Sequence, residues 1–124
     1  MKRQLTCVLL QATAIAVPYQ TCADTLPTGP DVTHGEATFA TPSLKQLDIN
    51  QTSNRAVVRW ESFDIGQAAG VTFNHPDSSA ATLNIVDSTT SSTLSGSLSA
   101  NGAVFLVNPH GVTVTPTGRV DTGG

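Results

Sequence analysis

The apolar residues of this chain fall into short runs separated by turn-forming residues, and they lack the three-to-four-residue spacing of an amphipathic helix. The runs are rich in Val, Ile, Leu and Phe, and they recur about every 7 to 13 residues with Gly, Asn, Pro, Asp or Ser between them. This pattern predicts an all-β protein. The expected strands are residues 47–49, 56–63, 71–73, 82–86, 103–107 and 112–114.

Turn signals separate these runs at residues 65–66, 74–77, 101–102 and 108–111. The stretch 88–99 is almost entirely Ser and Thr, and we expect it to be a loop. Leu94 and Leu98 within it indicate that part of this stretch packs against the protein.

Residues 101–112, NGAVFLVNPHGV, place five apolar residues between two strong turn signals. The sequence from Asn108 to Gly111 fits a type I turn. The Asn side chain accepts a backbone hydrogen bond, Pro109 presets φ to about −65°, and Gly111 lets the chain leave the turn without steric strain. At the other end we expect Gly102 to adopt a positive φ. The run is therefore predicted to be a strand of fixed length with two fixed corners.

The charged fraction is 12%, about half the usual quarter for a soluble domain, and Ser, Thr, Asn and Gly take the place of the charges. In a parallel β-helix each rung lies about 4.8 Å above the next, so stacked like charges repel while hydroxyl and amide groups can hydrogen-bond along the stack. The unbroken apolar run 103–107 also predicts a strand covered on both faces. These features favour a coil, although a hairpin or sandwich stays open because Asn-Gly is also a hairpin signal.

The first 23 residues have the pattern of an export signal, with Lys2 and Arg3 before an apolar stretch and small residues before Asp24. A membrane anchor is the alternative, but the apolar stretch is shorter than the roughly 20 residues a spanning helix needs. A lipoprotein attachment at Cys22 fits poorly, because the residues before it lack the expected Leu and small residue. We therefore expect a signal peptide at residues 1–23 and a mature domain at residues 24–124.

Both cysteines, Cys7 and Cys22, lie in the predicted signal, so the mature chain is expected to reach an oxidising compartment without a thiol. Removal of the signal leaves four basic residues against nine acidic ones, a net charge of −5. Nucleic acid is not an expected partner, because phosphate binding needs clustered Lys and Arg.

Catalytic and metal-binding chemistry have little support in the sequence. His34, His75 and His110 have no carboxylate or thiol at metal-ligand spacing, and we expect no metal or cofactor. No Gly-x-Ser-x-Gly elbow occurs, and the prediction is that the protein is not an enzyme. A polysaccharide-cleaving β-helix would need carboxylates that converge on one groove, and the candidates are Asp48, Glu61, Asp64 and Asp77.

Two long motifs carry a resemblance to a known family: QTSNRAVVRWESFDIG at residues 51–66 and SLSANGAVFLVNPHGV at residues 97–112. Together with LPTG at 26–29 and GRVD at 118–121, they resemble the N-terminal secretion domain of filamentous haemagglutinin-type exoproteins, the haemagglutination activity domain of two-partner secretion. The first motif contains the expected structural residues Arg55, Trp60, Phe63 and Gly66. The second contains the expected transporter-recognition residues Asn101, Gly102, Asn108, Pro109, His110 and Gly111.

The resemblance implies a right-handed parallel β-helix with an N-terminal cap and extra strands outside the coil. It also implies recognition by an outer-membrane transporter with periplasmic repeats, passage through the periplasm, and a secreted or cell-surface exoprotein of a Gram-negative bacterium that acts on host cells through its downstream part. The alternative function is an adhesin segment that binds a host ligand or haem directly.

The chain departs from the family at two points. His110 stands where the family usually has a second Asn, a position at which a type I turn tolerates most residues. The mature segment is also about half as long as the family's domains, which predicts a truncated domain whose coil is incomplete at its C-terminal end. An open strand edge there predicts poor solubility and marginal stability for the isolated chain.

Overall fold

The computed structural model describes residues 25–123, and these residues form strands and turns without a helix. No part of this described range could cross a membrane as a helix. The predicted signal peptide, residues 1–23, lies outside the described residues.

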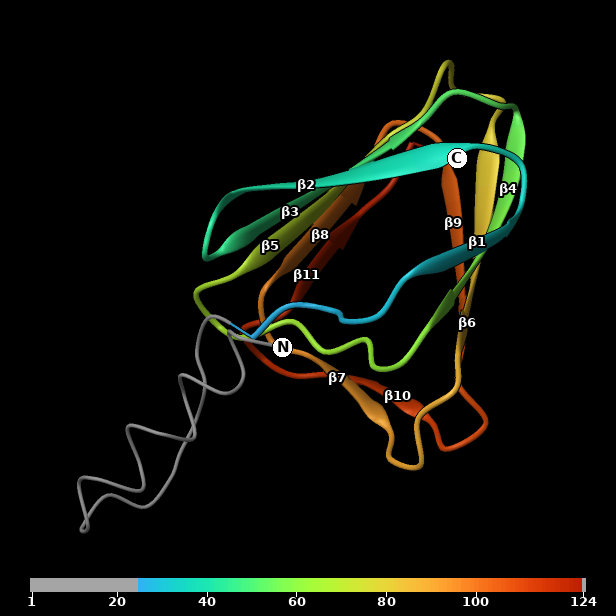
Figure 1. The fold of residues 1–124 in the computed structure, drawn as a ribbon. Helices are drawn as coiled ribbons and strands as arrows, with labels where there is room; N and C mark the ends of the chain where they lie inside the picture. The colour runs from blue at the N-terminus through green and yellow to red at the C-terminus, as the bar shows by residue number, and fades with distance from the viewer. Residues whose placement is uncertain (1–24, 124) are drawn as a thin grey trace, which may run out of the picture.

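The described strands form three sheets that make the three sides of a coil (Figure 1). The first sheet has the order β11-β8-β5-β3-β2, and its strands are β2 (Ala37–Ser43), β3 (Gln46–Gln51), β5 (Gly70–Asn74), β8 (Ser97–Ala100) and β11 (Arg119–Asp121). The second has the order β1-β4-β6-β9, with β1 (Asp31–His34), β4 (Arg55–Trp60), β6 (Ala81–Val86) and β9 (Ala103–Val107). The third pairs β7 (Ser92–Leu94) with β10 (Val112–Val114).

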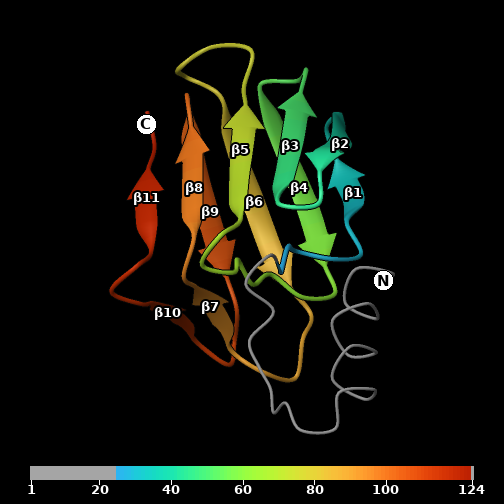
Figure 2. The same cartoon turned by 90° about the vertical axis from the view of Figure 1, so that its left-hand side faces the viewer.

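The chain visits the three sides in turn, so each strand pairs in parallel with the strand one turn later. Figure 2 shows β3, β5, β8 and β11 side by side and pointing the same way, with β4, β6 and β9 running in the opposite direction behind them. The result is a right-handed parallel β-helix of about three turns, as the resemblance implies. A hairpin at residues 101–102 is excluded, because β8 and β9 lie in different sheets.

The two ends of the coil differ. At the N-terminal end β1 pairs antiparallel with β4, and β2 pairs antiparallel with β3, so these two strands cap the first rung. At the other end β9, β10 and β11 each pair on one side only within residues 25–123. The structure therefore has the predicted N-terminal cap, and the last rung is open within the described residues.

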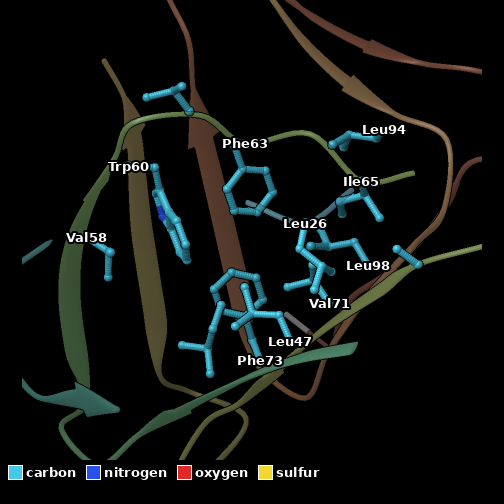
Figure 3. Close-up of a cluster of buried hydrophobic side chains, with 13 residues drawn as sticks. Leu26, Leu47, Val58, Trp60, Phe63, Ile65, Val71, Phe73, Leu94 and Leu98 are labelled. Atoms are coloured by element: carbon cyan, nitrogen blue, oxygen red, sulfur yellow. The ribbon is translucent and has the colours of Figure 1, made fainter. Parts of the chain in front are cut away.

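The interior of the coil is a single apolar cluster to which all three sides contribute (Figure 3). Trp60 is buried in this cluster, with ring centroids 5.7 Å from Phe39 and 5.2 Å from Phe63 in edge-to-face arrangements. Each large apolar side chain buried in this way stabilises the fold by about 1.5 to 3 kcal/mol relative to leaving it in water. The prediction that Trp60 is a packing residue is confirmed.

The sides of the coil carry the expected ladders of amides and hydroxyls. The amide of Asn74 donates to Oδ1 of Asn50 one rung earlier, at 2.9 Å. Asp48 and Asp121 share one ladder, but Thr72 and Ser99 separate them. No two like charges are neighbours in the parallel ladders of the described chain, as the low-charge argument predicts.

Three predictions about elements were wrong. The stretch 88–99 is not a loop, because it contains β7 and most of β8, although the expected packing of Leu94 and Leu98 is confirmed. The strand expected over residues 56–63 ends at Trp60. The run 103–107 is not covered on both faces, because Phe105 and Val107 point outward and are 57% and 48% exposed. Strand β9 is an edge strand, and its apolar outer face is open in the described chain.

Candidate functional site

The corner between β9 and β10 is a hydrogen-bonded turn built on Asn108. The backbone nitrogen of Gly111 donates to the carbonyl of Asn108 at 2.9 Å, and the nitrogen of His110 donates to its Oδ1 at 2.8 Å. Gly111 has a φ of +103°, which a residue with a Cβ rarely adopts. This geometry confirms a β-turn with a side-chain acceptor at its first position.

The Asn108 amide also ties this corner to the rung before it. Its Nδ2 donates to the carbonyl of Thr90 at 3.1 Å and to Oγ of Ser92 at 3.0 Å. The side chain is buried, whereas Pro109 and His110 beside it are exposed. In the folded coil the amide of Asn108 is therefore fully engaged by its own chain, and a partner can reach only the tip of the turn.

The corner between β8 and β9 is fixed in a similar way by Asn101. Its Oδ1 accepts a bond from the His75 nitrogen at 2.7 Å, and its Nδ2 donates to the His75 carbonyl at 3.0 Å. The Asn101 side chain thus bonds the backbone of His75, in the turn one rung earlier, as the backbone of a neighbouring strand would.

Gly102 is required at this corner for a different reason from the one predicted. Its φ is not positive, so the expectation of a left-handed glycine was wrong. A Cβ built there would lie 2.7 Å from the Ala80 carbonyl oxygen and 2.8 Å from the His75 ring. The corner therefore needs glycine because the Ala80 carbonyl and the His75 ring approach closely.

Under this corner His75 belongs to a buried polar chain. Its Nε2 lies 2.8 Å from Oγ1 of Thr82, and that hydroxyl donates in turn to Oε1 of Gln51. The ring stacks on Phe73 at a centroid distance of 6.2 Å, while Nδ1 has no hydrogen-bond partner. Burial lowers the pKa of His75, which keeps the imidazole neutral at pH 7.

Of the four predicted structural residues, Arg55 and Gly66 bond between rungs. The guanidinium of Arg55 donates to the Ser79 carbonyl at 3.0 Å, and the nitrogen of Gly66 donates to the Thr25 carbonyl at 2.8 Å. Trp60 and Phe63 lie in the core. These four residues and the six expected recognition residues are therefore not brought into one site.

Asn84 is an important residue that the sequence argument missed. It is fully buried, its Oδ1 accepts from Nε1 of Trp60 at 2.9 Å, and its Nδ2 donates to the Phe105 carbonyl at 3.1 Å. One amide therefore links β4, β6 and β9. The only signal in the sequence is a polar residue at an inward position of β6, next to apolar neighbours.

The carboxylates considered for catalysis do not face one another as a pair. Asp64 accepts from the Thr93 nitrogen one rung later, and Asp77 accepts from Ser79 within its own turn, so each carboxylate has a structural partner. A hollow of about 320 Å³ gathers Asp31, Glu61 and Asp87, and Asp87 is already bonded to Arg59 at 2.7 Å. Within residues 25–123 no group of three potential ligands is arranged to hold a metal ion.

The comparison with protein families decides what this coil is. Residues 23–124 match the family model of the TPS secretion domain. The chain belongs to this family. It is therefore a secretion domain, and the corners described above are parts of a TPS fold.

Relatives and solved structures agree with this assignment. A heme/hemopexin-binding protein of Haemophilus influenzae strain Rd is 35% identical over 117 residues, which are 94% of this chain and 13% of that protein. Another Haemophilus influenzae protein of the same name is 37% identical over 90 residues, 73% of this chain and 10% of that protein. The crystal structure of the HMW1 secretion domain from Haemophilus influenzae superposes with a TM-score of 0.68 at 36% identity, and the match covers 72% of this chain and 23% of that one.

Proposed function

We propose that this TPS secretion domain directs a longer exoprotein to the surface of a Gram-negative bacterium, and that an outer-membrane transporter with periplasmic repeats recognises it on the way. The family match supports the secretion role. The chain spans only about an eighth of the length of a relative that it matches along nearly all of its own residues, which is in keeping with a domain that serves a longer protein.

The observation that carries the recognition proposal is the internal bonding of the two corner amides. Asn101 bonds both backbone groups of His75, and Asn108 uses its amide on Thr90, Ser92 and His110. Asn108 is buried in the folded coil, so a transporter can contact its side chain only before the third rung has closed, whereas Asn101 stays exposed although its amide is bonded to His75. We therefore propose that the recognised form is the extended chain, captured by strand addition with the Asn108 corner setting the register.

Two features of the chain suit an extended export form. The described residues contain no cysteine, so no disulfide can close the coil in an oxidising compartment. Every rung pairs with residues from a different turn, and folds dominated by such non-local contacts form slowly. Both features leave time for the transporter to act before the coil is complete.

Asn108→Ala in the full-length exoprotein, co-expressed with its transporter, tests the role of the corner. Loss of the transporter's bonds to this amide in the extended chain should lower the secreted fraction by about tenfold, the equivalent of roughly 1.4 kcal/mol. Asn50→Ala is the matched control, because its exposed amide lies in a ladder outside the corner, and it should be secreted like the wild type. Unchanged secretion of the Asn108 variant would show that the transporter does not recognise this corner.

A binding measurement separates recognition from folding, since Asn108→Ala also removes bonds that stabilise the coil. The transporter's periplasmic part should bind freshly diluted, unfolded chain and should bind the refolded coil much more weakly. Asn108→Ala should weaken binding of the unfolded chain. Preferential binding of the refolded coil, with sensitivity to Pro109→Ala and His110→Ala at the exposed tip, would instead mean that the folded corner is read.

Direct binding of haem or a host ligand is not favoured. The names of the relatives refer to proteins of which this chain matches 13% or less, and the matched part is the secretion domain. Of the three histidines, His75 is buried and bonded to Thr82, while His34 and His110 lie on different turns.

A further inference from the structure

Asn101 and Gly102, at the corner between β8 and β9, are two neighbours that can react with each other. The backbone nitrogen of the residue after an asparagine can attack the side-chain carbonyl carbon, and glycine permits this best because no Cβ shields its nitrogen or restricts its backbone. Asn101-Gly102 is the only Asn-Gly pair in the sequence. At the next corner Asn108 precedes Pro109, whose nitrogen carries no hydrogen and cannot complete the attack. The two corner asparagines are therefore chemically unequal.

The folded coil holds the Asn101 side chain away from this reaction. Its Oδ1 accepts from the His75 nitrogen at 2.7 Å, and its Nδ2 donates to the His75 carbonyl at 3.0 Å. Both ends of the amide are thus bonded to the turn one rung earlier. Rotation of Cγ toward the Gly102 nitrogen would break both bonds.

The backbone on the other side of the reacting pair is fixed as well. Gly102 is buried, and a Cβ there would lie 2.7 Å from the Ala80 carbonyl oxygen. The nitrogen of Ala103 donates to the same carbonyl at 3.0 Å. Asn101 itself is exposed, so water can reach it in the folded coil. Protection therefore comes from hydrogen bonds and a fixed backbone, and not from exclusion of water.

We propose that Asn101 is a self-modification site that is reactive in the extended chain and protected in the folded coil. In the extended chain the Gly102 nitrogen bonds to Cγ of Asn101, the bond from Cγ to Nδ2 breaks, and ammonia leaves with the proton from the glycine nitrogen. Water then opens the cyclic imide at either of its two carbonyl carbons. The products are aspartate and isoaspartate, in which the main chain runs through the former side chain.

Neither product fits the corner. An aspartate can still accept from the His75 nitrogen, but its carboxylate has no hydrogen for the His75 carbonyl and sets an oxygen against it. An isoaspartate adds one backbone atom next to Gly102, which is already packed against Ala80 and His75. A chain that stays extended too long therefore loses the ability to close its third rung. This consequence for export rests on the proposed function, whereas the reaction itself does not.

Peptide mapping of the full chain by mass spectrometry tests the site. Refolded chain, freed of unfolded material by gel filtration, is incubated at mildly alkaline pH beside chain kept in guanidinium chloride. A synthetic peptide of residues 97–112 in both buffers corrects for the denaturant. Conversion of Asn101 should be at least about tenfold slower in the folded chain, because the reaction waits for local opening of the coil.

Asn108 is the internal control for this measurement, and it should keep its amide in both samples because Pro109 follows it. Equal rates at Asn101 in the folded and unfolded chains would overturn the proposal. Conversion of Asn108 as fast as that of Asn101 would also overturn it, since the attack by the Gly102 nitrogen would then not be the route.

Replacement by aspartate tests whether the corner rejects the product. Asn101→Asp should unfold at a lower urea concentration than the wild type, as measured by Trp60 fluorescence. Asn50→Asp is the matched control, because Asn50 accepts from Asn74 through Oδ1 and a carboxylate can do the same. It should keep the wild-type midpoint. A wild-type midpoint for Asn101→Asp, or an equal loss in both variants, would contradict the proposal.

Discussion

At the scale of single residues, the polar side chains buried in this narrow coil differ in how fully they are hydrogen-bonded. Both ends of the Asn84 amide bond to groups on neighbouring rungs. The Nδ1 of His75, in contrast, is buried without a partner. Burial of the ring disfavours a positive charge, and it outweighs the side chain of Asn101, which favours the charged form.

The stability of the coil should therefore fall in mild acid. Burial lowers the pKa of His75 in the folded state below its ordinary value of 6.5, so below pH 6.5 the unfolded chain binds a proton that the folded chain resists. The stability that depends on a neutral His75 is fully present above pH 6.5, and it declines as the pH falls toward the folded-state pKa. Urea midpoints measured by Trp60 fluorescence at about pH 7.5 and about pH 5.5 report this slope.

His75→Gln should flatten that slope, because glutamine can still bond Thr82 but does not titrate. His34→Gln is the control, since its ring is exposed on β1, and it should retain the wild-type slope. Equal slopes in all three proteins would mean that His75 is not the source of the acid sensitivity.

At the scale of elements, the strands that could be predicted are those whose own sequence defines them. The bounds predicted for β9 and β10 match the structure because turn residues bracket short apolar runs. Like β7 and β8, the strands β1, β2 and β11 were not predicted. The last three are mostly exposed, and they become strands by pairing with an existing edge. The Asn108 turn could be predicted because it is local, whereas the need for Gly102 arises from contacts with the previous rung.

The two corner glycines should respond differently to the same substitution. Gly102→Ala forces a Cβ against the Ala80 carbonyl and the His75 ring, and it should lower the free energy of unfolding by about 2 to 3 kcal/mol. Gly111→Ala meets only Ser91 Cβ at 3.9 Å and should cost about 1 to 2 kcal/mol through its φ of +103°. Urea unfolding measures both. A larger loss of stability at Gly111 would mean that backbone conformation, and not close approach of neighbouring atoms, makes glycine necessary at these corners.

At the scale of the whole molecule, the fold depends on the stacking of equivalent positions along one axis. A residue therefore meets the residues at the same place one rung above and below it, whatever their distance in sequence. Thr72 lies directly between Asp48 and Ser99, and Ala81 lies between Arg55 and Ala103. A charge added to either ladder acts mainly on these neighbours, about 4.8 Å away.

A new carboxylate should therefore have different effects in the ladder of Asp48, Thr72 and Ser99 and in the ladder of Arg55, Ala81 and Ala103. Thr72→Asp sets a second negative charge beside Asp48 and should lower the free energy of unfolding by about 1 to 2 kcal/mol, with partial recovery in about 1 M salt. Ala81→Asp sets its carboxylate beside Arg55, which offsets the poor strand propensity of Asp, and should change stability by less than about 0.5 kcal/mol. Thr72→Asn, which keeps a hydrogen-bonding side chain without the charge, should also be tolerated. Urea unfolding at low and high salt distinguishes these cases, and an equal, salt-independent loss in both Asp variants would show that charge stacking does not limit the composition of this coil.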